Sequence, residues 1–458
     1  MLQLRPYQAD LIADTRRALR HHRRVLLQLP TGGGKTVISA TMMGNAATRG
    51  MRSWFVVHRR ELIDQTSRTL EAVGVPHGFI AAGMPPRYRE PVTLCSVQTL
   101  RSRAERLIEH YGAPDLVVWD ESHHCAAGTW GKVAALLPNA FHVGLTATPE
   151  RLDGKGLDGM FRALVPGPSV RWLIEQGYLA KYRVWTHTPP DLSGVRTRGA
   201  DYDPAALGAV MSDRFLLGDC VQHYLDICGG KQAIAFCVSV EHAIATRDAF
   251  RAAGVVAEEL DGGADGRTRR EVIKAFREGK IKVLTSVDLF GEGFDLPELT
   301  AAILLRPTKS LGLHLQQVGR ALRTSPGKDF AIILDHAGNI AEHGLPDEER
   351  QWSLQGRSRR ARKGSEPVKT CGNCFGTAPA AALTCPYCGQ AFTGLPRDVE
   401  QVAGNLVEID VEAFKRQQKR EVVQAKTREE LERVARERGY KKAWVDHIMK
   451  ARGARVGA

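Results

Sequence analysis

The sequence predicts an α/β protein with two tandem parallel-sheet domains, a small cysteine-rich segment and a helical C-terminal tail. Short apolar, β-rich runs alternate with helix-like segments in two separate series, a pattern typical of parallel strands joined by crossover helices. Four clustered cysteines follow the second series, and a stretch rich in Lys, Arg and Glu comes after them. The 458 residues suffice for at least two hydrophobic cores.

The two series of apolar runs give the expected strands. The first series covers residues 25–29, 54–57, 92–97, 116–119 and 143–146, and the second covers 233–238, 255–260, 283–286, 301–305 and 330–334. Between them, residues 166–225 contain many Pro and Gly residues without sustained periodicity, which indicates a connector or insertion. We therefore expect one domain over residues 1–165 and a second over 226–340.

The composition changes again after the second domain. Residues 341–369 include the basic stretch RSRRARKG and are expected to form a linker. Residues 370–392 hold the cysteine cluster. In the tail, 393–458, apolar residues fall at spacings typical of short amphipathic helices with a break at Gly439-Tyr440, namely Leu431, Val434, Ala435, Trp444 and Ile448.

The chain carries a formal charge of +13 and a pI near 9.4, which suits a polyanionic partner. On charge alone, that partner is a nucleic acid, a membrane surface or an acidic protein. No apolar stretch approaches the ~18 to 20 residues that span a bilayer, and the N-terminus lacks the order of a signal peptide. We therefore expect a cytoplasmic protein without a membrane partner. Five scattered cysteines are expected to be free thiols, namely Cys95, Cys125, Cys220, Cys228 and Cys237.

The run LPTGGGKT, residues 29–36, lies between an expected strand and an expected helix, as a phosphate-binding loop requires. Its glycines let backbone N–H groups approach phosphates, and the helix N-terminus adds a favourable dipole. We expect Lys35 to contact the β and γ phosphates of ATP and Thr36 to ligate Mg²⁺, while the loop itself is formed by Thr31, Gly32, Gly33 and Gly34. Leu29 replaces the outer glycine of the general pattern, and a structural turn is the alternative.

Asp120 and Glu121 directly follow the apolar run at 116–119. We expect Asp120 to hold Mg²⁺ and Glu121 to polarise the water that attacks the γ phosphate. A lone Asp-Glu pair is also common on solvated turns. The phosphate loop upstream favours the catalytic interpretation.

The two elements TGGGKT and DESH resemble motifs I and II of superfamily 2 helicases, the DEAD/DEAH-box class. Other runs resemble further motifs in order: LRPYQ at 4–8 the Q motif, VHRREL at 57–62 motif Ia, LTATP at 145–149 motif III, FGEGFDLP at 290–297 motif V, and QQVGRALR at 316–323 motif VI. The resemblance covers roughly residues 1–340. It implies that both domains are RecA-like and that ATP and Mg²⁺ bind between them.

The resemblance also implies roles for individual residues. Arg5, Tyr7, Gln8, Gly293 and Asp295 would join the nucleotide site. Arg320 and Arg323, with Gln316 orienting, would stabilise charge on the γ phosphate, an effect worth about 10³ to 10⁵ in rate in related systems. A surface salt-bridge cluster is the alternative for this helix. Nucleic-acid contacts are expected at His58, Arg59, Gln98, Thr99, Thr148, Thr285 and Thr308.

Motif II departs from the usual DEAD or DEAH in having Ser122, which is small enough to replace Ala. His123 holds the position that couples to the other motifs in this family, and a metal role for the His123-His124 pair is not expected. The runs LRPTKS at 305–310 and ILDHAGN at 333–339 most resemble RadD-type repair helicases and phage-encoded relatives. That resemblance alone favours DNA over RNA, with a single-strand-binding or repair protein as a candidate partner.

The clustered cysteines Cys371, Cys374, Cys385 and Cys388 form the pattern C-x₂-C-x₁₀-C-x₂-C. Four thiolates can close a tetrahedral Zn²⁺ site, and we expect a structural zinc ribbon, which RadD-type proteins also carry. The spacer is shorter than usual for such ribbons. Disulfides are the alternative and are disfavoured inside cells.

Together these features predict an ATP-dependent helicase or translocase, acting on DNA in repair or recombination. One rival is a nucleic-acid-stimulated ATPase that remodels nucleoprotein complexes without separating strands. A second rival is a zinc-dependent binding protein with a vestigial ATPase half, against which Lys35, Asp120, Glu121 and Arg320 argue. The basic linker and tail either contact phosphates or form solvated helix faces.

Overall fold

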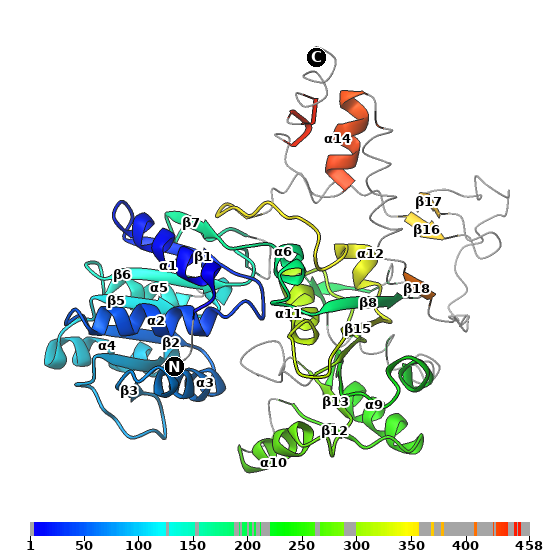
Figure 1. The fold of residues 1–458 in the computed structure, drawn as a ribbon, viewed down its shortest axis with the longest axis horizontal. Helices are drawn as coiled ribbons and strands as arrows, with labels where there is room; N and C mark the ends of the chain where they lie inside the picture. The colour runs from blue at the N-terminus through cyan, green and yellow to red at the C-terminus, as the bar shows by residue number, and fades with distance from the viewer. Residues whose placement is uncertain are drawn as a thin grey trace. The chain divides into compact units, whose positions relative to one another are not determined.

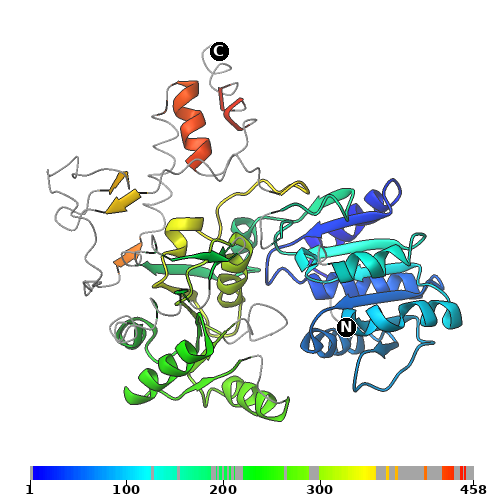
Figure 2. The same ribbon diagram turned by 180° about the vertical axis from the view of Figure 1, so that it is seen from behind.

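A computed structural model gives the fold (Figures 1 and 2). The structure describes residues 4–124, 128–151, 155–186, 220–261, 266–287 and 299–356, and shorter pieces at 192, 195–198, 201–203, 206–207, 211, 368–370, 377–379, 407–409, 425, 427–437, 444–446 and 448–449. The chain divides into two compact units. The first is Met1–Gly356 with Gly404–Glu408, and the second is Arg357–Ala403 with Ile409–Ala458.

The first unit contains two seven-stranded sheets, the first of which is entirely parallel with the order β3-β4-β2-β5-β6-β1-β7. Its strands are β1 (Arg24–Gln28), β2 (Ser53–Val57), β3 (His77–Ile80), β4 (Val92–Ser96), β5 (Leu116–Trp119), β6 (Phe141–Thr146) and β7 (Ala163–Pro166). All five strands expected in this half are confirmed. The edge strands β3 and β7 lack a long apolar run, because an edge strand is buried on fewer sides.

Helices flank this first sheet, as Figure 1 shows in blue and cyan. They are α1 (Pro6–Leu19), α2 (Lys35–Ala47), α3 (Arg60–Ala72), α4 (Val97–Tyr111) and α5 (Gly128–Ala135), with a short 3₁₀ turn at Ser122–His124. Helix α2 packs beside α1 and α3, whereas α4 packs beside α5. The loops that carry the expected site residues leave the carboxyl ends of β1, β5 and β6, the usual ligand edge of a parallel sheet.

The second sheet has the order β12-β13-β11-β14-β15-β8-β18, and its strands from β12 to β8 run parallel. The strands are β8 (Lys181–Thr186), β11 (Ala233–Phe236), β12 (Ala257–Glu259), β13 (Val283–Ser286), β14 (Ala301–Leu304), β15 (Phe330–Asp335) and β18 (Val407–Ile409). All five strands expected here are present. The added strand β8 comes from the segment expected to be a connector, and its polar residues at alternate positions conceal it in the sequence.

The helices of this second half are α6 (Val170–Glu175), α9 (Val240–Ala252), α10 (Gly266–Arg277), α11 (Leu311–Ala321) and α12 (Asn339–His343), with one π-helical turn at Tyr224–Cys228. Two short strands, β9 (Thr197–Arg198) and β10 (Asp201–Tyr202), pair as a small antiparallel hairpin. Residues 4–166 form the first domain, and residues 170–353, which include α6, form the second domain.

The chain returns to the first domain after the second sheet is complete. Leu354 is 8% exposed and belongs to the hydrophobic core of the first domain. Its carbonyl accepts hydrogen bonds from the backbone N–H groups of Leu157 and Asp158. The stretch expected to be a linker from residue 341 is therefore folded as far as Gly356.

The second unit is described in part. Strands β16 (Val368–Thr370) and β17 (Thr377–Pro379) pair antiparallel, and α14 covers Arg428–Glu437. The apolar side chains expected on amphipathic helices, namely Leu431, Val434, Ala435, Trp444 and Ile448, pack in one small core, which Ala425 and Val445 complete. The cysteines Cys371, Cys374, Cys385 and Cys388 lie outside the described residues. No helix in the described part of the chain combines the length and the apolar character that crossing a membrane requires.

Candidate nucleotide and nucleic-acid site

The phosphate loop connects β1 to α2, as the sequence predicts. Gly32 and Gly34 adopt φ angles of 84° and 90°, in the left-handed region that favours glycine. Lys35 begins α2, and its ammonium donates to the carbonyl of Leu29 at 3.3 Å. The backbone therefore forms a tight turn at a helix N-terminus, which is suited to bind phosphate.

The residues of the Q motif contact this loop directly. The Tyr7 hydroxyl donates to Gly33 O at 2.7 Å, and Gln8 Nε2 donates to the same carbonyl at 3.1 Å. Gln8 Oε1 accepts the backbone N–H of Arg5 at 3.0 Å. A Cβ on Gly34 would lie 2.3 Å from Gln8 Nε2. The N-terminus of α1 thus fixes the conformation of the phosphate loop.

An aromatic cluster that the sequence does not reveal lies beside the Q motif. The rings of Tyr7 and Tyr178 are 5.2 Å apart, and the Arg5 guanidinium lies 4.6 Å above the Tyr178 ring. Trp172 packs edge-on against Tyr7. Leu179, next in the chain, approaches within 2.8 Å of the position of a Cβ on Gly32. Residues after β7 therefore help to form the nucleotide side of the site.

Motif II places two carboxylates at the end of β5. Glu121 has a φ of 48°, and among the described residues it is the one non-glycine residue with a positive φ. Such strain is commonly found where a side chain must be aimed. Glu121 Oε1 lies 4.0 Å from Lys35 Nζ, and both side chains are about 10% exposed. Motifs I and II therefore meet in this structure.

The environment of Asp120 fits a divalent cation. Burial and the neighbouring charge of Glu121 raise the pKa of Asp120 to about 7, while the ammonium of Lys35 opposes this rise. Two buried carboxylates beside one ammonium leave an excess of negative charge. Mg²⁺ prefers hard oxygen ligands, which the Asp120 carboxylate and the Thr36 hydroxyl can supply together with water and phosphate.

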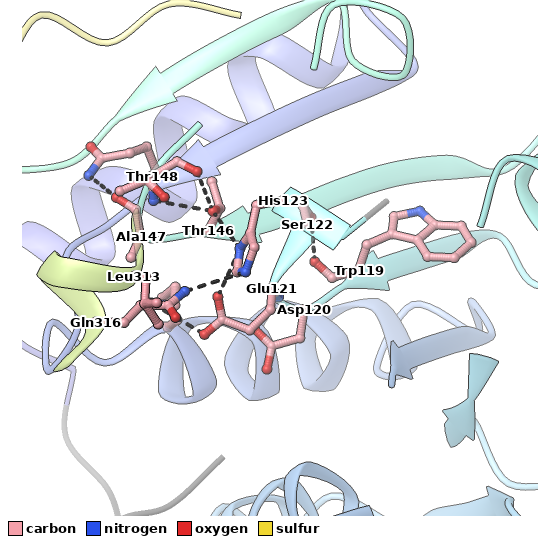
Figure 3. Close-up of polar contacts among 12 residues, drawn as sticks. Trp119, Asp120, Glu121, Ser122, His123, Thr146, Ala147, Thr148, Leu313 and Gln316 are labelled. Carbon is pink, nitrogen blue, oxygen red and sulfur yellow. Dashed lines mark hydrogen bonds and ion pairs between the residues drawn. The ribbon is translucent and has the colours of Figure 1, made fainter. Parts of the chain in front are cut away.

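His123 connects three motifs, as Figure 3 shows. Its Nδ1 lies 3.5 Å from Glu121 Oε2 and 3.4 Å from the hydroxyl of Thr146 in motif III. On the other side of the ring, Nε2 lies 3.4 Å from Nε2 of Gln316, on α11. If the Gln316 amide N–H donates to this ring nitrogen, Nδ1 carries the proton and faces Glu121. The predicted coupling role of His123 is consistent with these contacts.

Helix α11 approaches the first domain through two glycines. A Cβ on Gly319 would lie 2.7 Å from Thr31 Cβ, and a Cβ on Gly312 would lie 2.9 Å from the Thr148 hydroxyl. Arg320 follows Gly319 and is 7% exposed. Arg323 places its Cγ 3.4 Å from the position of a Cβ on Gly32. Both candidate arginines therefore lie near the phosphate loop.

The residues expected to contact nucleic acid lie in different environments. Gln98 is exposed, and its amide donates to the carbonyl of His58 at 3.0 Å. Arg59 is the N-cap residue of α3. Thr99 and Thr148 are buried, with 8% and 1% exposure.

The remaining two expected contacts lie in the second domain. Thr285 is fully buried, and its hydroxyl donates to Ala243 O at 2.8 Å. Thr308 donates its hydroxyl to the carboxylate of Asp201, a partner that the sequence does not indicate. Gly293 and Asp295 of motif V lie outside the described residues.

Comparison with known proteins agrees with these motifs. Residues 1–151 match the family model for the type III restriction enzyme res subunit, and residues 218–325 match the helicase conserved C-terminal domain. A 51.5 kDa protein of a Lactococcus phage is 34% identical over 80% of this chain and 78% of its own length. The DNA 3'-5' translocase XPB2 of Sulfurisphaera tokodaii is 26% identical over 70% of this chain and 79% of its own length.

A solved structure shares the fold. A fragment from Vibrio vulnificus, provisionally assigned as the HsdR subunit of a type I restriction enzyme, aligns with a TM-score of 0.59 at 21% identity. The alignment covers 74% of this chain and 65% of that one. Two parallel RecA-like domains, the ordered motifs and these similarities lead to one assignment. The chain belongs to the superfamily 2 helicases and is an ATP-dependent helicase, an ATP hydrolase.

Proposed function

We propose that this helicase is a DNA translocase in which Lys35 and Arg320 act on the same γ phosphate from opposite domains. The contact between His123 and Gln316 carries the proposal, because it joins motif II to the helix that bears Arg320. Glu121 would orient the attacking water, and Thr36 and Asp120 would hold Mg²⁺. The cation would offset negative charge on the phosphates. Tyr7 and Gln8, with the phosphate loop, would position the nucleotide.

Strand movement would follow from a difference in affinity between two arrangements of the domains. If ATP favours the arrangement in which α11 contacts Thr31 and Thr148, hydrolysis would weaken that contact. Thr148 belongs to motif III, one of the segments expected to contact nucleic acid. Loss of the contact between Gly312 and Thr148 would therefore alter the grip on the strand.

One relative and the finer motifs support DNA as the substrate. The archaeal relative is named as a DNA translocase, and the chain resembles RadD-type repair helicases in its finer motifs. The test is ATP turnover with single-stranded DNA, duplex DNA and RNA between about 50 and 200 mM salt. DNA should stimulate turnover more than RNA, and stimulation should fall steeply with salt because phosphate contacts release counterions. Stronger stimulation by RNA would overturn the choice of DNA.

Strand separation is tested separately. A duplex with a single-stranded tail of either polarity should be opened in the presence of ATP. If DNA stimulates turnover but neither substrate opens, the motor remodels nucleoprotein complexes without separating strands. Turnover by the wild type equal to that of Lys35→Ala would mean that the ATPase half is vestigial.

We also infer a structural zinc ion held by Cys371, Cys374, Cys385 and Cys388. The paired strands β16 and β17 precede and follow the first Cys-x-x-Cys in the chain. Purified protein should contain one zinc ion per chain by mass spectrometry, and Cys374→Ser or Cys388→Ser should lose it. Cys228→Ser is the matched control, because Cys228 is a buried free thiol. Zinc retained by both cluster variants would contradict the site.

The resemblance to RadD-type repair helicases also supports a role in repair or recombination in the cytoplasm. A single-strand-binding or repair protein is the candidate partner. Affinity capture of the tagged protein, with and without nuclease treatment, would separate direct protein partners from those bridged by DNA. Loss of every repair protein after nuclease treatment would remove the direct partner from the proposal.

A further inference from the structure

A carboxylate from the segment expected to be a connector accepts hydrogen bonds from the loop that leads into α11. Asp201 lies on β10, and the loop at residues 305–310 follows β14. Asp201 Oδ2 accepts the Thr308 hydroxyl at 2.7 Å, and Oδ1 accepts the backbone N–H of Lys309 at 2.8 Å. The two oxygens of one anion therefore take two neighbouring donors of one loop.

These donors are held in place by the second domain itself. The backbone N–H of Thr308 donates to Asn339 Oδ1 at 3.0 Å, and Asn339 Nδ2 donates to Arg306 O at 2.9 Å. The N–H of Ser310 donates to the Thr308 hydroxyl oxygen at 3.0 Å, which leaves the hydroxyl proton directed at Asp201. Thr308 is only 2% exposed. The donors are therefore preorganised for an anion.

The hairpin that brings Asp201 to this loop is small. Each of its strands has two residues, and such a pair has little stability of its own. Tyr202 packs against a minor apolar cluster with Leu207, Met211 and Val238. The Lys309 ammonium lies 4.5 Å above the Tyr202 ring. The exposed Lys309 ammonium and the Asp201 carboxylate, which accepts two hydrogen bonds from residues 308 and 309, therefore lie at the same loop.

We propose that Asp201 is an internal substitute for a phosphate of the nucleic-acid strand. The Thr308 hydroxyl and the Lys309 N–H would bind one backbone phosphate, and Asp201 occupies that site until a strand displaces it. Phosphate and carboxylate oxygens accept the same charge-assisted hydrogen bonds. Lys309, released from Tyr202, would pair with the phosphate. This inference rests on the proposed function.

The position of the loop gives the exchange a consequence for ATP hydrolysis. Ser310 caps α11, with its side chain accepting the N–H of Leu313 at 3.3 Å. The same helix carries Gln316 and Arg320 and touches Thr148 through Gly312. Replacement of Asp201 by a phosphate would therefore change the hydrogen bonds of the loop that leads into α11, the helix that completes the ATP site. Asp201 would lower ATP turnover while no strand is bound.

The test is Asp201→Asn, which keeps the shape of the side chain and removes its charge. Binding of a labelled oligothymidylate without ATP, followed by fluorescence anisotropy, should tighten roughly three- to tenfold because the competing anion is lost. ATP turnover without nucleic acid should rise. Asp203→Asn is the matched control, because it makes the same charge change in the same segment while the Asp203 carboxylate accepts the N–H of Ala206 instead.

A double variant separates the proposed exchange from general electrostatics. In a Thr308→Val background, Asp201→Asn should no longer tighten binding, since the phosphate site has lost its hydroxyl. Equal tightening in that background, or tightening by Asp203→Asn, would overturn the proposal. Weaker or unchanged binding by Asp201→Asn would do so too and would make Asp201 a permanent tether. If the wild type neither binds nor responds to any nucleic acid, the proposed function itself fails.

Discussion

In the first domain the candidate catalytic groups are held by polar contacts within that domain, whereas the second domain presents its groups on one helix through close packing. Lys35, Glu121 and His123 form a chain of contacts in which each neighbouring pair lies within 4.0 Å. Helix α11 instead meets the first domain where Gly312 and Gly319 leave no room for a side chain. One half of the site is therefore built in advance, and the other half depends on how closely α11 approaches.

The largest expected effect separates the two halves of the site. Arg320→Ala should lower ATP turnover about 10³-fold or more while nucleotide affinity changes little, because its charge acts on the transition state. Lys35→Ala should lose nucleotide affinity as well as turnover. Steady-state kinetics and nucleotide-binding titrations measure both quantities. Arg17→Ala is the control, since the Arg17 side chain is 71% exposed. Equal loss of affinity in both variants would remove the distinction.

Acid should destabilise both domains, each through a buried histidine. Burial lowers the pKa of His142 in the first domain and of His242 in the second to about 4 from 6.5. Each favours its neutral form in the folded state, so stability is fully present above pH 6.5 and falls as pH drops toward 4. The loss is about 3 kcal/mol for each histidine.

Urea unfolding at a series of pH values would measure this dependence. His142→Gln and His242→Gln should each flatten the slope by about 1.4 kcal/mol per pH unit in that window. The exposed His22→Gln provides the control. A slope that neither variant changes would assign acid sensitivity to other groups.

The close packing of α11 is tested at Gly319. An alanine there would overlap Thr31, at a cost of about 1 to 3 kcal/mol when the two domains are in contact. In the helix itself alanine is favoured over glycine by roughly 1 kcal/mol. Gly319→Ala should therefore lower ATP turnover about tenfold or more without lowering the melting temperature. Gly131→Ala is the matched helical control, because a Cβ at Gly131 meets no atom within 4 Å. Normal turnover in Gly319→Ala would show that this approach is not needed for hydrolysis.

The fold and the ATP motifs were largely predictable from the sequence, because both depend on local patterns. Central strands such as β5 and β14 are continuous apolar runs and are readily recognised. Strand β8 was hidden because it contains no continuous apolar run, and Lys181 and Arg183 are exposed. The contact of Tyr178 with Arg5 and that of Asp201 with Thr308 were not predictable. Each joins residues that lie far apart in the chain, and no local spacing records such a pairing.

The smallest expected effect tests the polar link between the two halves of the site. Gln316 Nε2 lies 3.4 Å from Nε2 of His123, and Nδ1 of the same ring lies 3.5 Å from Glu121 Oε2. If the amide donates to the ring, it helps to select the tautomer in which Nδ1–H faces the carboxylate. His123→Ala, Gln316→Ala and the double variant form a cycle, measured as kcat/KM for ATP with nucleic acid present. Contacting residues usually couple by roughly 0.5–3 kcal/mol, and about 1 kcal/mol is expected for one neutral hydrogen bond.

The size of this coupling energy shows whether ATP hydrolysis depends on the contact between His123 and Gln316. A coupling near 1 kcal/mol would mean that hydrolysis in the first domain depends on a polar contact with α11, and Gly319→Ala should then reduce it by holding the helix away. Additive effects of the two single variants would mean that His123 serves the first domain alone. In that case the position of Arg320 would depend on the close packing of α11 at Gly312 and Gly319. The first domain would then hold its catalytic groups by polar contacts, and the second domain by close packing alone.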